Sequence, residues 1–565
     1  IRGRSPSRGL GDVYKRQVFR EGGVSILRLY LEKGINELKF ERKLNLMKQS
    51  LEKNTLIIAL ITGSVIWGGT SVYAEEPEQV FTLDPMVVTA QRMETRDLDT
   101  PAAVEVLNHE QLIATGGNNL QEALKFGTGL MFQSQGTKGT SQGTMNSKII
   151  IRGVEKGTLV LVDGVPLNQS GRYNLEDIST EMVEKVEIIR GGGAVLYGSE
   201  ATGGVINIIT RGKRPNKIKT SFGNYEQQSH AISLQASKLG VSYAYDKIGN
   251  IDNISDPNGG RPVGNYYTIT RGEHNNFNIR YDFNEKLYFS HTYNENNAHY
   301  VYRYKPQNGA INKDVIHTIK NHMSQLHYDD KSIKAVLYYN DKKQNAFTKA
   351  RNSKSKPTEY LETMKSFSNA GYHDKSLGFD VQKNWILNKN TAVLGISFQN
   401  DKCDYKEDSL TLANNKYTFA SRDYERSMYS IYGQYSHYLN QASNIIFSVR
   451  ETWTGSTKAE DLNGVNYSKF TPEIEYINKI NDDTSVYAKA GQSFMMPTFT
   501  QMFGSGNIVG NADLKPQHGN HFEIGFKKNT DNHAWRLAVF NYKIKDSIES
   551  KSVSYTHLRA HETDS

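Results

Sequence analysis

Apolar and polar residues alternate in short segments through the C-terminal part of the chain, from about Ile218 to Glu549. Period-two alternation places one set of side chains on each face of a β-strand. Polar stretches of variable length separate these segments, and we predict long loops at 294–314 and 342–365. Three segments show the pattern, with apolar members Ile333, Ala335, Leu337 and Tyr339; Ile445, Phe447 and Val449; and Ala538, Phe540, Tyr542 and Ile544.

Residues 91–212 have a different texture, with runs of β-branched residues, a dense set of glycines and one helix-like segment. A helix is predicted at 119–124, because Asn119 can cap its start and Gly127 and Gly129 follow its end. The segment has the size of an ordinary domain. The pattern therefore predicts an α+β domain that precedes an all-β region.

The N-terminal part carries the pattern of a secretory signal peptide at 47–74. The first methionine is Met47, and two lysines precede the apolar run 56–61. Residues 72–74 end in the small residue Ala74 and are a candidate site for cleavage of the signal peptide. A membrane anchor is the alternative, but the apolar run is short and polar residues interrupt it. Residues 75–90 then form a short acidic lead.

The two ends of the chain, residues 1–46 and 550–565, are expected to lie outside the native protein, so that the native C-terminus is missing. The net charge is +8, and residues 1–46 supply six of these eight charges. The remainder is nearly neutral. The basic balance therefore does not indicate a nucleic-acid partner.

The composition suits a transmembrane β-barrel. Tyrosine is abundant, at 33 residues, and no long apolar segment follows the signal. The strands of such a barrel alternate between lipid-facing apolar and lumen-facing polar residues, so their hydropathy averages out. The single cysteine, Cys403, excludes an internal disulfide. A soluble all-β protein with one solvated face is the alternative, because alternation alone does not separate the two.

Three motifs in the α+β segment are the most informative part of the sequence. They are Ile150 to Gly153, Leu161 to Pro166, and the long run from Val186 to Thr210. Together they resemble the plug domain of TonB-dependent outer-membrane receptors, and the resemblance covers roughly residues 84–549. It implies an all-β transmembrane barrel, 22-stranded in the family and incomplete here, with an N-terminal α+β plug domain.

The region 218–549 is too short for 22 strands at about ten residues for each membrane-crossing strand plus loops. The resemblance divides the native chain into a plug at 91–212 and a partial barrel at 218–549. The glycines of the plug motifs show no phosphate-loop spacing, so tight turns and close packing against a barrel wall explain them better. These glycines are Gly153, Gly164, Gly191, Gly192, Gly193, Gly198, Gly203 and Gly204.

A short β-prone island near the start of the plug resembles the family's TonB box. An extended segment on a flexible lead can add as a strand to the sheet edge of a partner, here the TonB energy-transducing complex. Main-chain hydrogen bonds would then transmit the pull. An ordinary first plug strand is the alternative. The island consists of Met86, Val87, Val88, Thr89 and Ala90.

Two plug arginines, Arg152 and Arg190, each end a β-branched run and precede a glycine. The resemblance implies that they contact glutamates of the barrel, since guanidinium groups pair well with carboxylates. Glu523 is the candidate partner. The family often has an acidic residue where Gln517 stands, which leaves that contact open. Solvated strand-end arginines are the alternative.

Ligand contacts are expected where the outer loops of plug and barrel meet. In the plug, Arg172 and Tyr173 are candidates. In the barrel, an aromatic and cationic cluster suits an anionic ferric catecholate through charge and cation–π contacts. Interface tyrosines with snorkelling cations are the alternative. The cluster consists of Tyr300, Tyr302, Arg303, Tyr304 and Lys305.

Three histidines, His299, His518 and His521, raise the possibility of haem ligation, but no metal site is assigned. His518 and His521 lie three residues apart in a segment that is not helical, so helical ligand spacing does not apply. We find no paired carboxylates, Ser/His/Asp order or zinc spacing, and therefore predict a protein that is not an enzyme.

The sequence thus predicts a monomeric receptor among the outer-membrane lipids of a Gram-negative bacterium, without a permanently bound cofactor. It would import a scarce small-molecule ligand by energy-coupled remodelling of the plug. A ferric siderophore is favoured, which makes iron transport the expected role, with cobalamin or haem as alternatives. A passive porin or an adhesin is the alternative class, but neither requires a plug or a TonB box.

Overall fold

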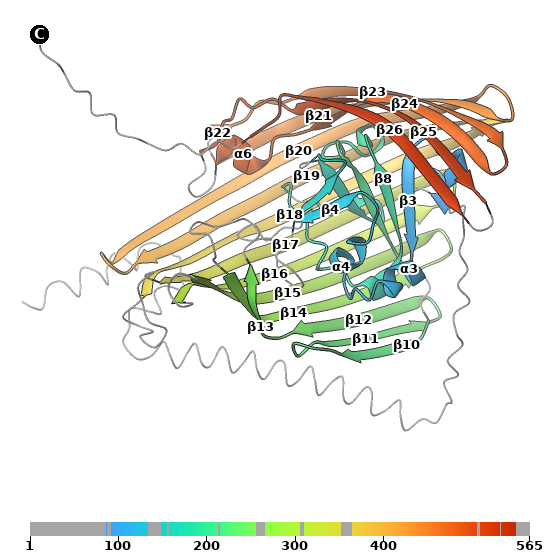
Figure 1. The fold of residues 1–565 in the computed structure, drawn as a ribbon. Helices are drawn as coiled ribbons and strands as arrows, with labels where there is room; N and C mark the ends of the chain where they lie inside the picture. The colour runs from blue at the N-terminus through green and yellow to red at the C-terminus, as the bar shows by residue number, and fades with distance from the viewer. Residues whose placement is uncertain are drawn as a thin grey trace, which may run out of the picture. The chain divides into compact units, whose positions relative to one another are not determined.

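The computed structural model describes much of the chain between residues 86 and 549 (Figure 1). Except for residues 416–418 at the start of β20, the fold below belongs to one compact unit, residues 81–414 with 419–565. The predicted signal peptide, both flanking ends and residues 88–90 of the predicted TonB box lie outside the described residues. Those residues are 86–87, 92–133, 148–154, 157–168, 170–212, 215–255, 266–304, 310–351, 364–460, 462–504, 509–530 and 533–549.

The plug is built on a five-stranded sheet in the order β3-β8-β9-β6-β7. Strands β6 and β9 run parallel, and the other neighbours are antiparallel. Two further pairs, β1–β2 and β4–β5, stand apart from this sheet. The bounds are β1 Met86–Val87, β2 Thr95–Arg96, β3 Ala103–Asn108, β4 Leu130–Gln133, β5 Lys148–Ile151, β6 Thr158–Val162, β7 Val165–Pro166, β8 Val183–Arg190 and β9 Gly204–Thr210.

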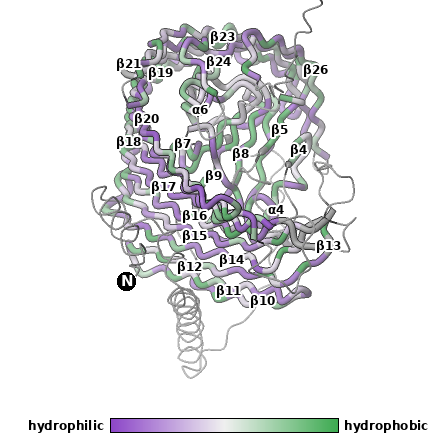
Figure 2. Tube along the Cα trace, turned by 90° about the vertical axis from the view of Figure 1, so that its left-hand side faces the viewer, coloured by the Kyte–Doolittle hydropathy of each residue, from purple (hydrophilic) through white to green (hydrophobic). Residues whose placement is uncertain are grey.

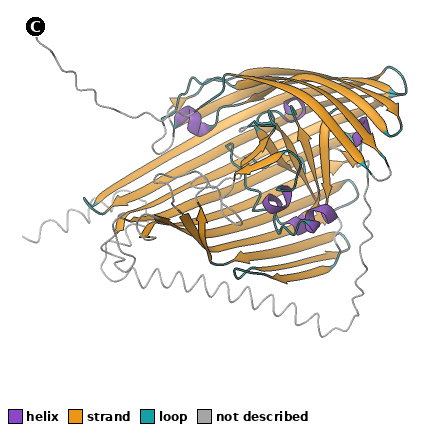
Figure 3. Cartoon of the chain, viewed as in Figure 1, coloured by secondary structure: helices purple, strands orange, loops and turns teal. Residues whose placement is uncertain are grey.

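Short helices join the plug strands (Figure 3). The predicted helix at 119–124 is confirmed, because the Asn119 side chain accepts a hydrogen bond of 3.0 Å from the backbone N–H of Glu122 at the start of α4. The helices are α3 His109–Ala114, α4 Leu120–Leu124 and α5 Ala194–Tyr197, with 3-10 turns η2 Asp97–Asp99 and η3 Thr180–Met182.

The plug has its own aliphatic core between its sheet and the helices α3 and α4. The β-branched runs of β8 and β9 supply its centre, where Val186, Ile188, Ile206 and Ile208 are fully buried. Fully burying one such side chain contributes roughly 1.5–3 kcal/mol. The β-branched motifs that drew attention in the sequence therefore hold the plug together internally.

A 17-stranded sheet, here called the wall, runs in sequence order from β10 to β26. It curves around the plug (Figures 1 and 2), and each of its described pairings is antiparallel. Strands β10 and β26 end the sheet and are not paired with each other within the described residues. In the same part of the chain, no helix is long and apolar enough to cross a membrane.

Most of the wall strands are long, and β10, β13 and β22 are short. The wall strands are β10 Lys217–Phe222, β11 Gln228–Ala236, β12 Leu239–Ile248, β13 Ile251–Ser255, β14 Tyr266–Asp282, β15 Leu287–Tyr304, β16 Ala310–Asp329, β17 Ile333–Arg351, β18 Met364–Leu387, β19 Asn390–Thr411, β20 Lys416–Tyr438, β21 Ser443–Ala459, β22 Leu462–Asn463, β23 Ser468–Asn481, β24 Thr484–Met495, β25 Gln517–Asn529 and β26 Ala534–Lys545. One helix, α6 Phe499–Phe503, lies between β24 and β25.

The wall has the two faces that the alternation predicts, with hydrophobic and hydrophilic positions interleaved along its strands (Figure 2). On β17, Leu337 is 52% exposed on the outer face, whereas the next residue, Tyr338, is buried against the plug side. On β21, Phe447 is exposed and Arg450 is buried. The predicted outward faces of these two strands are confirmed.

For the last strand, the predicted face is wrong. In β26 the outward residues are Leu537 and Val539, which are exposed, while Phe540 packs under the guanidinium group of Arg152 of the plug at 4.1 Å. Both faces of this strand carry apolar residues. Alternation therefore predicts a strand here but does not predict which of its faces points outward. The contact of one face with the plug explains why the inward side is aromatic.

The predicted loops at 294–314 and 342–365 are too long. Strand β15 continues to Tyr304 and β16 begins at Ala310, while β17 continues to Arg351 and β18 begins at Met364. A tilted strand crosses a membrane with about 9–11 residues, so strands of this length continue beyond it. Their outer parts have polar residues on both faces, which hid them in the sequence.

Candidate functional site

The contacts between plug and wall form the candidate site, and the first of them involves Arg92. This residue follows the predicted TonB box by two positions. Its Nη1 donates to Asp380 Oδ1 of β18 at 2.8 Å and to the hydroxyl of Tyr432 of β20 at 2.8 Å. Its Nη2 donates to the carbonyl oxygen of Leu196 in α5 at 2.7 Å. Arg92 therefore joins the N-terminal segment to the wall and to the body of the plug.

A second contact lies a few residues further on, at the turn η2. The Asp97 carboxylate is buried and accepts from Lys527 Nζ of β25 at 2.7 Å and from Arg536 Nε of β26 at 2.8 Å. Lys527 also donates to the carbonyl oxygens of Asp97 and Thr100. The single carboxylate of Asp97 thus faces two cations, and the whole turn is bound to the last wall strands.

The structure places Arg152 against Glu523, the partner expected from the sequence. Arg152 Nη1 donates to Glu523 Oε2 at 2.6 Å, and both side chains are buried. The hydroxyl of Tyr487 donates to the other carboxylate oxygen at 2.5 Å. Charge-assisted hydrogen bonds of this kind are stronger than neutral ones.

The plug backbone approaches the wall most closely at Gly191 and Gly192. A Cβ atom on Gly192 would lie 2.2 Å from Cε1 of His521, and one on Gly191 would lie 3.0 Å from Nη1 of Arg152. Lys489 Nζ of β24 donates to the carbonyl oxygen of Gly192 at 2.9 Å. Close packing against His521 of the wall is thus a sufficient reason for glycine at position 192, whereas Gly191, at φ +93°, has a backbone conformation that itself favours glycine.

Arg190 does not follow the expectation. Its Nη2 bonds to Glu105 of the plug, and its Nε donates to the carbonyl oxygen of Thr128 at 3.1 Å. The register explains this, because Arg190 pairs with Ala103 of β3 and Glu105 follows two positions along on the same face. Arg190 therefore stabilises the plug internally and makes no described contact with a wall glutamate.

The plug residues proposed as ligand contacts are both buried. Arg172 Nη2 donates to both carboxylate oxygens of Asp374 of β18, at 2.7 and 2.8 Å, and its guanidinium group lies 3.9 Å from the ring centre of Tyr372. The hydroxyl of Tyr173 accepts from the backbone N–H of Ile149 within the plug core. Arg172 thus forms a further plug–wall ion pair, and Tyr173 supports the plug.

The barrel residues of the predicted ligand cluster lie on β15. Tyr300 and Tyr302 are buried with an edge-to-face contact, and the Tyr300 hydroxyl lies 2.6 Å from Nε2 of His317. Lys313 Nζ lies 5.4 Å from the ring centre of Tyr302. The backbone of Arg303 and Tyr304 continues the strand, whereas their side chains and all of Lys305 lie outside the described part of the chain.

The three histidines are not brought together. His299 Nε2 lies 2.5 Å from Asp314, and His521 Nε2 lies 2.9 Å from Glu473. His518 and His521 both belong to β25, where an odd separation places them on opposite faces. Among the described residues, no group of three or more His, Cys, Asp or Glu side chains could hold a metal ion.

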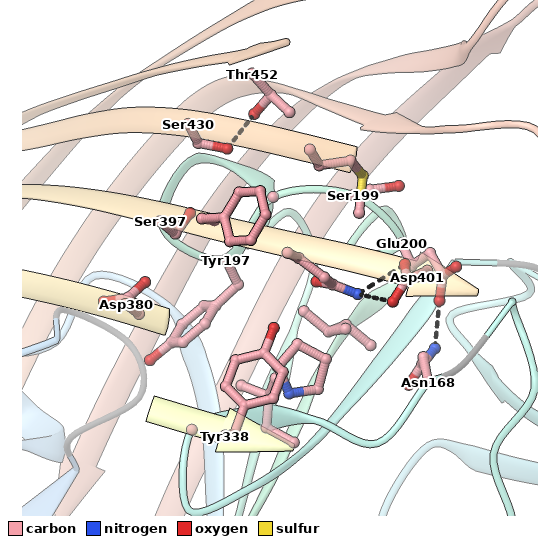
Figure 4. A pocket seen from close by; sticks show the side chains of 18 of the residues that line it. Asn168, Tyr197, Ser199, Glu200, Tyr338, Asp380, Ser397, Asp401, Ser430 and Thr452 are labelled. Atoms are coloured by element: carbon pink, nitrogen blue, oxygen red, sulfur yellow. Dashed lines mark hydrogen bonds between the residues drawn. The ribbon is translucent and has the colours of Figure 1, made fainter. Parts of the chain in front are cut away.

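A cavity of about 90 Å³ separates the plug from wall strands β17 to β21 (Figure 4). Charged groups of both signs surround it. They are Arg92, Arg426 and Arg450, together with Glu200, Asp380 and Asp401.

Only two of these six charged groups have a described counterion in contact. Arg92 pairs with Asp380, whereas Arg426, Arg450, Glu200 and Asp401 make no ion pair with any described residue. Burial raises the pKa of the Glu200 carboxyl above its ordinary value, although Asn168 donates a hydrogen bond of 2.5 Å to it. The cavity is therefore a polar gap in an otherwise tightly packed interface.

The sequence analysis missed Arg92, Asp380 and Arg450. Arg92 has a local signal, because it is the first cation after the predicted TonB box. Asp380 has none, since it lies 288 residues from Arg92 and only the curvature of the wall brings the two together. Arg450 directly follows Val449, the last apolar member of an alternating segment, and nothing in that pattern distinguishes it from other polar positions.

Two family models match the chain. The model described as "TonB dependent receptor-like, beta-barrel" matches residues 234–560, which is more than half of the chain, and the "TonB-dependent Receptor Plug Domain" matches residues 96–205. Among known proteins, the chain is similar to the vitamin B12 transporter BtuB of Vibrio cholerae serotype O1. The two are 23% identical over 520 residues, which cover 89% of this chain and 76% of the transporter.

Two solved structures share the fold. One is FpvA of P. aeruginosa bound to heterologous pyoverdines, with a TM-score of 0.60, 14% identity and coverage of 81% of this chain and 65% of that receptor. The chain thus spans slightly less than two thirds of its length. The other is the alcaligin outer-membrane receptor FauA of Bordetella pertussis, with a TM-score of 0.58, 14% identity and coverage of 83% of this chain and 76% of that receptor.

Proposed function

We propose energised import across the outer membrane as the function of this chain, which belongs to the family of TonB-dependent receptors. The resemblance stated from the sequence, and the fold class of an all-β wall with an α+β plug, are thereby confirmed. The family consists of receptors and transporters of the outer membrane rather than enzymes.

The Arg92 contact is the observation that carries this proposal. The predicted TonB box precedes Arg92 directly, so a force applied to the box along the backbone reaches this residue first. Arg92 holds Asp380 and the carbonyl oxygen of Leu196. A strand that pairs with TonB through its main chain can transmit such a force regardless of its side chains.

The next contacts along the chain follow the same logic. Behind Arg92 lies the η2 turn, bound to Lys527 and Arg536 through Asp97. Each contact depends on a few short hydrogen bonds, and a displacement of a few ångströms removes them. The aliphatic core of the plug does not depend on such directional bonds. The plug–wall interface can therefore open while the plug sheet remains folded.

For the ligand, we favour a ferric siderophore. The aromatic residues Tyr300 and Tyr302 beside Lys313 support a ligand that is anionic and aromatic. FpvA, which shares the fold, is bound to a pyoverdine, and FauA is an alcaligin receptor. Cobalamin is the second candidate, because the similarity to the vitamin B12 transporter extends over most of this chain. Haem ranks behind both, because His299 and His521 contact different carboxylates and His518 lies on the opposite face of β25 from His521.

The remaining parts of the proposal follow from the family. The receptor would reside as a monomer in the outer membrane of a Gram-negative bacterium, engage the TonB complex through residues 86–90 and hold no resident cofactor. The plug would extend from 91 to 212 and the barrel region from 218 to 549. The family match to the barrel runs to residue 560, into the segment that the sequence analysis set apart.

Uptake by the full-length receptor tests this proposal. Labelled ferric catecholate and labelled cobalamin are each offered to a host without its own receptors, with and without collapse of the proton gradient. Val88→Pro removes a main-chain donor from the TonB box and should abolish uptake while the barrel stays folded. Val88→Ala keeps that donor and should transport normally.

The outcomes separate the alternatives. Uptake that survives both Val88→Pro and loss of the proton gradient would show a passive pore. Energised uptake of cobalamin but not of ferric catecholate would replace the siderophore by the second candidate. Uptake of neither by a folded, surface-exposed receptor would exclude both ligands, and haem would then be tested.

A further inference from the structure

Two arginines from different parts of the molecule donate to one carbonyl oxygen. Arg92 Nη2 lies 2.7 Å from the oxygen of Leu196, and Arg450 Nη1 of β21 lies 3.2 Å from the same atom. Leu196 belongs to α5, the short helix that faces the wall beside the cavity. The N-terminal segment and the wall therefore hold the same point of the plug.

The two arginines differ in their other partners. Arg92 has a carboxylate, Asp380, at 2.8 Å. Arg450 is buried and has only neutral partners, with Nη2 donating to the Ser397 hydroxyl at 2.9 Å and Nε donating to the Thr452 hydroxyl at 3.1 Å. A buried cation without an anion in contact is costly.

The register of the wall strands places a carboxylate, that of Asp380, next to the residue that binds Arg450. Ser397, which holds Arg450, is the residue of β19 directly opposite Asp380 of β18. Side chains of opposite residues in antiparallel strands have Cβ atoms about 4.5–5.5 Å apart. The Tyr432 ring also lies beside both cations, 4.5 Å from the Arg92 guanidinium carbon and 5.2 Å from that of Arg450.

We propose that Arg450 is a positioning residue that takes the place of Arg92 at Asp380 when the N-terminal segment is withdrawn, and that this exchange releases α5 from the wall. The proposal rests on the proposed function, in which TonB pulls on that segment. Withdrawal of Arg92 leaves the partly buried Asp380 carboxylate without a cation in contact, with the Tyr432 hydroxyl still donating to it at 2.7 Å. Arg450 has no carboxylate in contact and is held by Ser397, the residue opposite Asp380, so rotation of its side chain toward Asp380 would pair both groups.

The exchange has a consequence for the plug. Leu196 loses the Arg92 donor by withdrawal and the Arg450 donor by the exchange. Gly198, at φ +89°, packs directly on Arg450, since a Cβ atom there would lie 3.3 Å from Nε. Movement of the Arg450 side chain therefore removes a packing partner as well, and the adjacent cavity widens between plug and wall.

Hydrogen exchange of the full-length receptor in detergent tests this inference without TonB or ligand. The reporters are the amides of Gly193 and Tyr197, which bond to the oxygens of Ala201 and Gly193 around α5. Arg92→Ala should increase their exchange by about tenfold or more, as loss of hydrogen bonds from charged donors implies. The core amides of β8 and β9 should not change, which shows that the plug remains folded.

The decisive variant adds Asp380→Asn to Arg92→Ala. Without the carboxylate, Arg450 has no reason to leave Leu196, so exchange at α5 should return close to the wild-type rate. In the Arg450→Gln background, adding Asp380→Asn to Arg92→Ala should make no difference. If the α5 amides exchange hydrogen equally fast in Arg92→Ala with and without the added Asp380→Asn, the proposal that Arg450 replaces Arg92 at Asp380 is overturned. Energised uptake by the wild-type receptor, measured in parallel, would show that the proposed function stands even then.

Discussion

The interior of the plug and its boundary with the wall are stabilised in different ways. In the interior, aliphatic side chains such as Val186, Ile188 and Ile206 are fully buried, and many weak contacts together stabilise the core. At the boundary, the wall holds the plug through separate ion pairs, including Arg92–Asp380 and Arg152–Glu523. The boundary also leaves room for the polar cavity.

This difference matters because the two regions respond differently to a pull. Hydrophobic burial has no preferred direction and is lost only when the whole core opens. An ion pair with good geometry is lost over a few ångströms. A plug can therefore detach from the wall in steps while its sheet persists, and the following predictions test that separation.

The largest effect is expected at the buried pair of Arg152 and Glu523. Arg152→Met leaves a buried carboxylate without its cation and should weaken plug–wall docking by about 3–5 kcal/mol. Denaturant-induced release of the plug measures this. The double variant Arg152→Met with Glu523→Leu should recover most of the loss. A double variant as unstable as the single one would show that the pair is not the cause.

A core substitution should come next, and its effect should extend across the whole plug sheet. Ile206→Ala removes buried methyl groups from β9 and should lower the free energy of unfolding of the plug by about 2–5 kcal/mol. Hydrogen exchange should then rise together in β8 and β9. A rise confined to the plug–wall contacts would contradict the separation of core and boundary.

Gly192→Ala tests the close approach at the boundary. The new Cβ would meet the ring of His521, 2.2 Å from Cε1, so either the ring or the plug must move. Overpacking of this kind costs about 1–3 kcal/mol. His521→Ala in the same chain should relieve it, and thermal release of the plug is the measurement. If His521→Ala brings no relief, the backbone itself requires glycine at this position.

The smallest effect is expected from pH, through Glu200 beside the cavity. Burial raises the pKa of this carboxyl, and the Asn168 hydrogen bond and Arg426 partly offset the rise. Since the folded plug holds the proton more tightly, this contribution to stability is fully present below the ordinary value of 4.5 and is lost as the pH rises through the raised value. Unfolding of the plug measured against pH should show this slope, and Glu200→Gln should remove it. An unchanged slope in Glu200→Gln would assign it to another group.

The sequence allowed prediction where a local pattern carries the information. Alternation located three of the wall strands, β17, β21 and β26, and the caps and glycines located α4. It did not give the inward face of β26, because both faces are apolar and the plug decides between them. Arg152 could be matched with Glu523 only through the family resemblance. Asp380 had no signal, since its role depends on the curvature of the wall.

Arg172 shows a second limit of prediction from the sequence. Its charge made it a ligand candidate, but Asp374 compensates it in a buried pair. A sequence shows which residues are charged but not which are already neutralised by a distant strand.

The most direct test of the stepwise detachment is force measurement on the full-length receptor in a membrane, pulled from its N-terminus. We predict a first rupture that releases the segment through η2 while the plug sheet stays folded, and Arg92→Ala should lower the force of that event alone. Ile206→Ala should weaken only a later event. A single rupture of the whole plug, weakened by Ile206→Ala and unaffected by Arg92→Ala, would contradict the account.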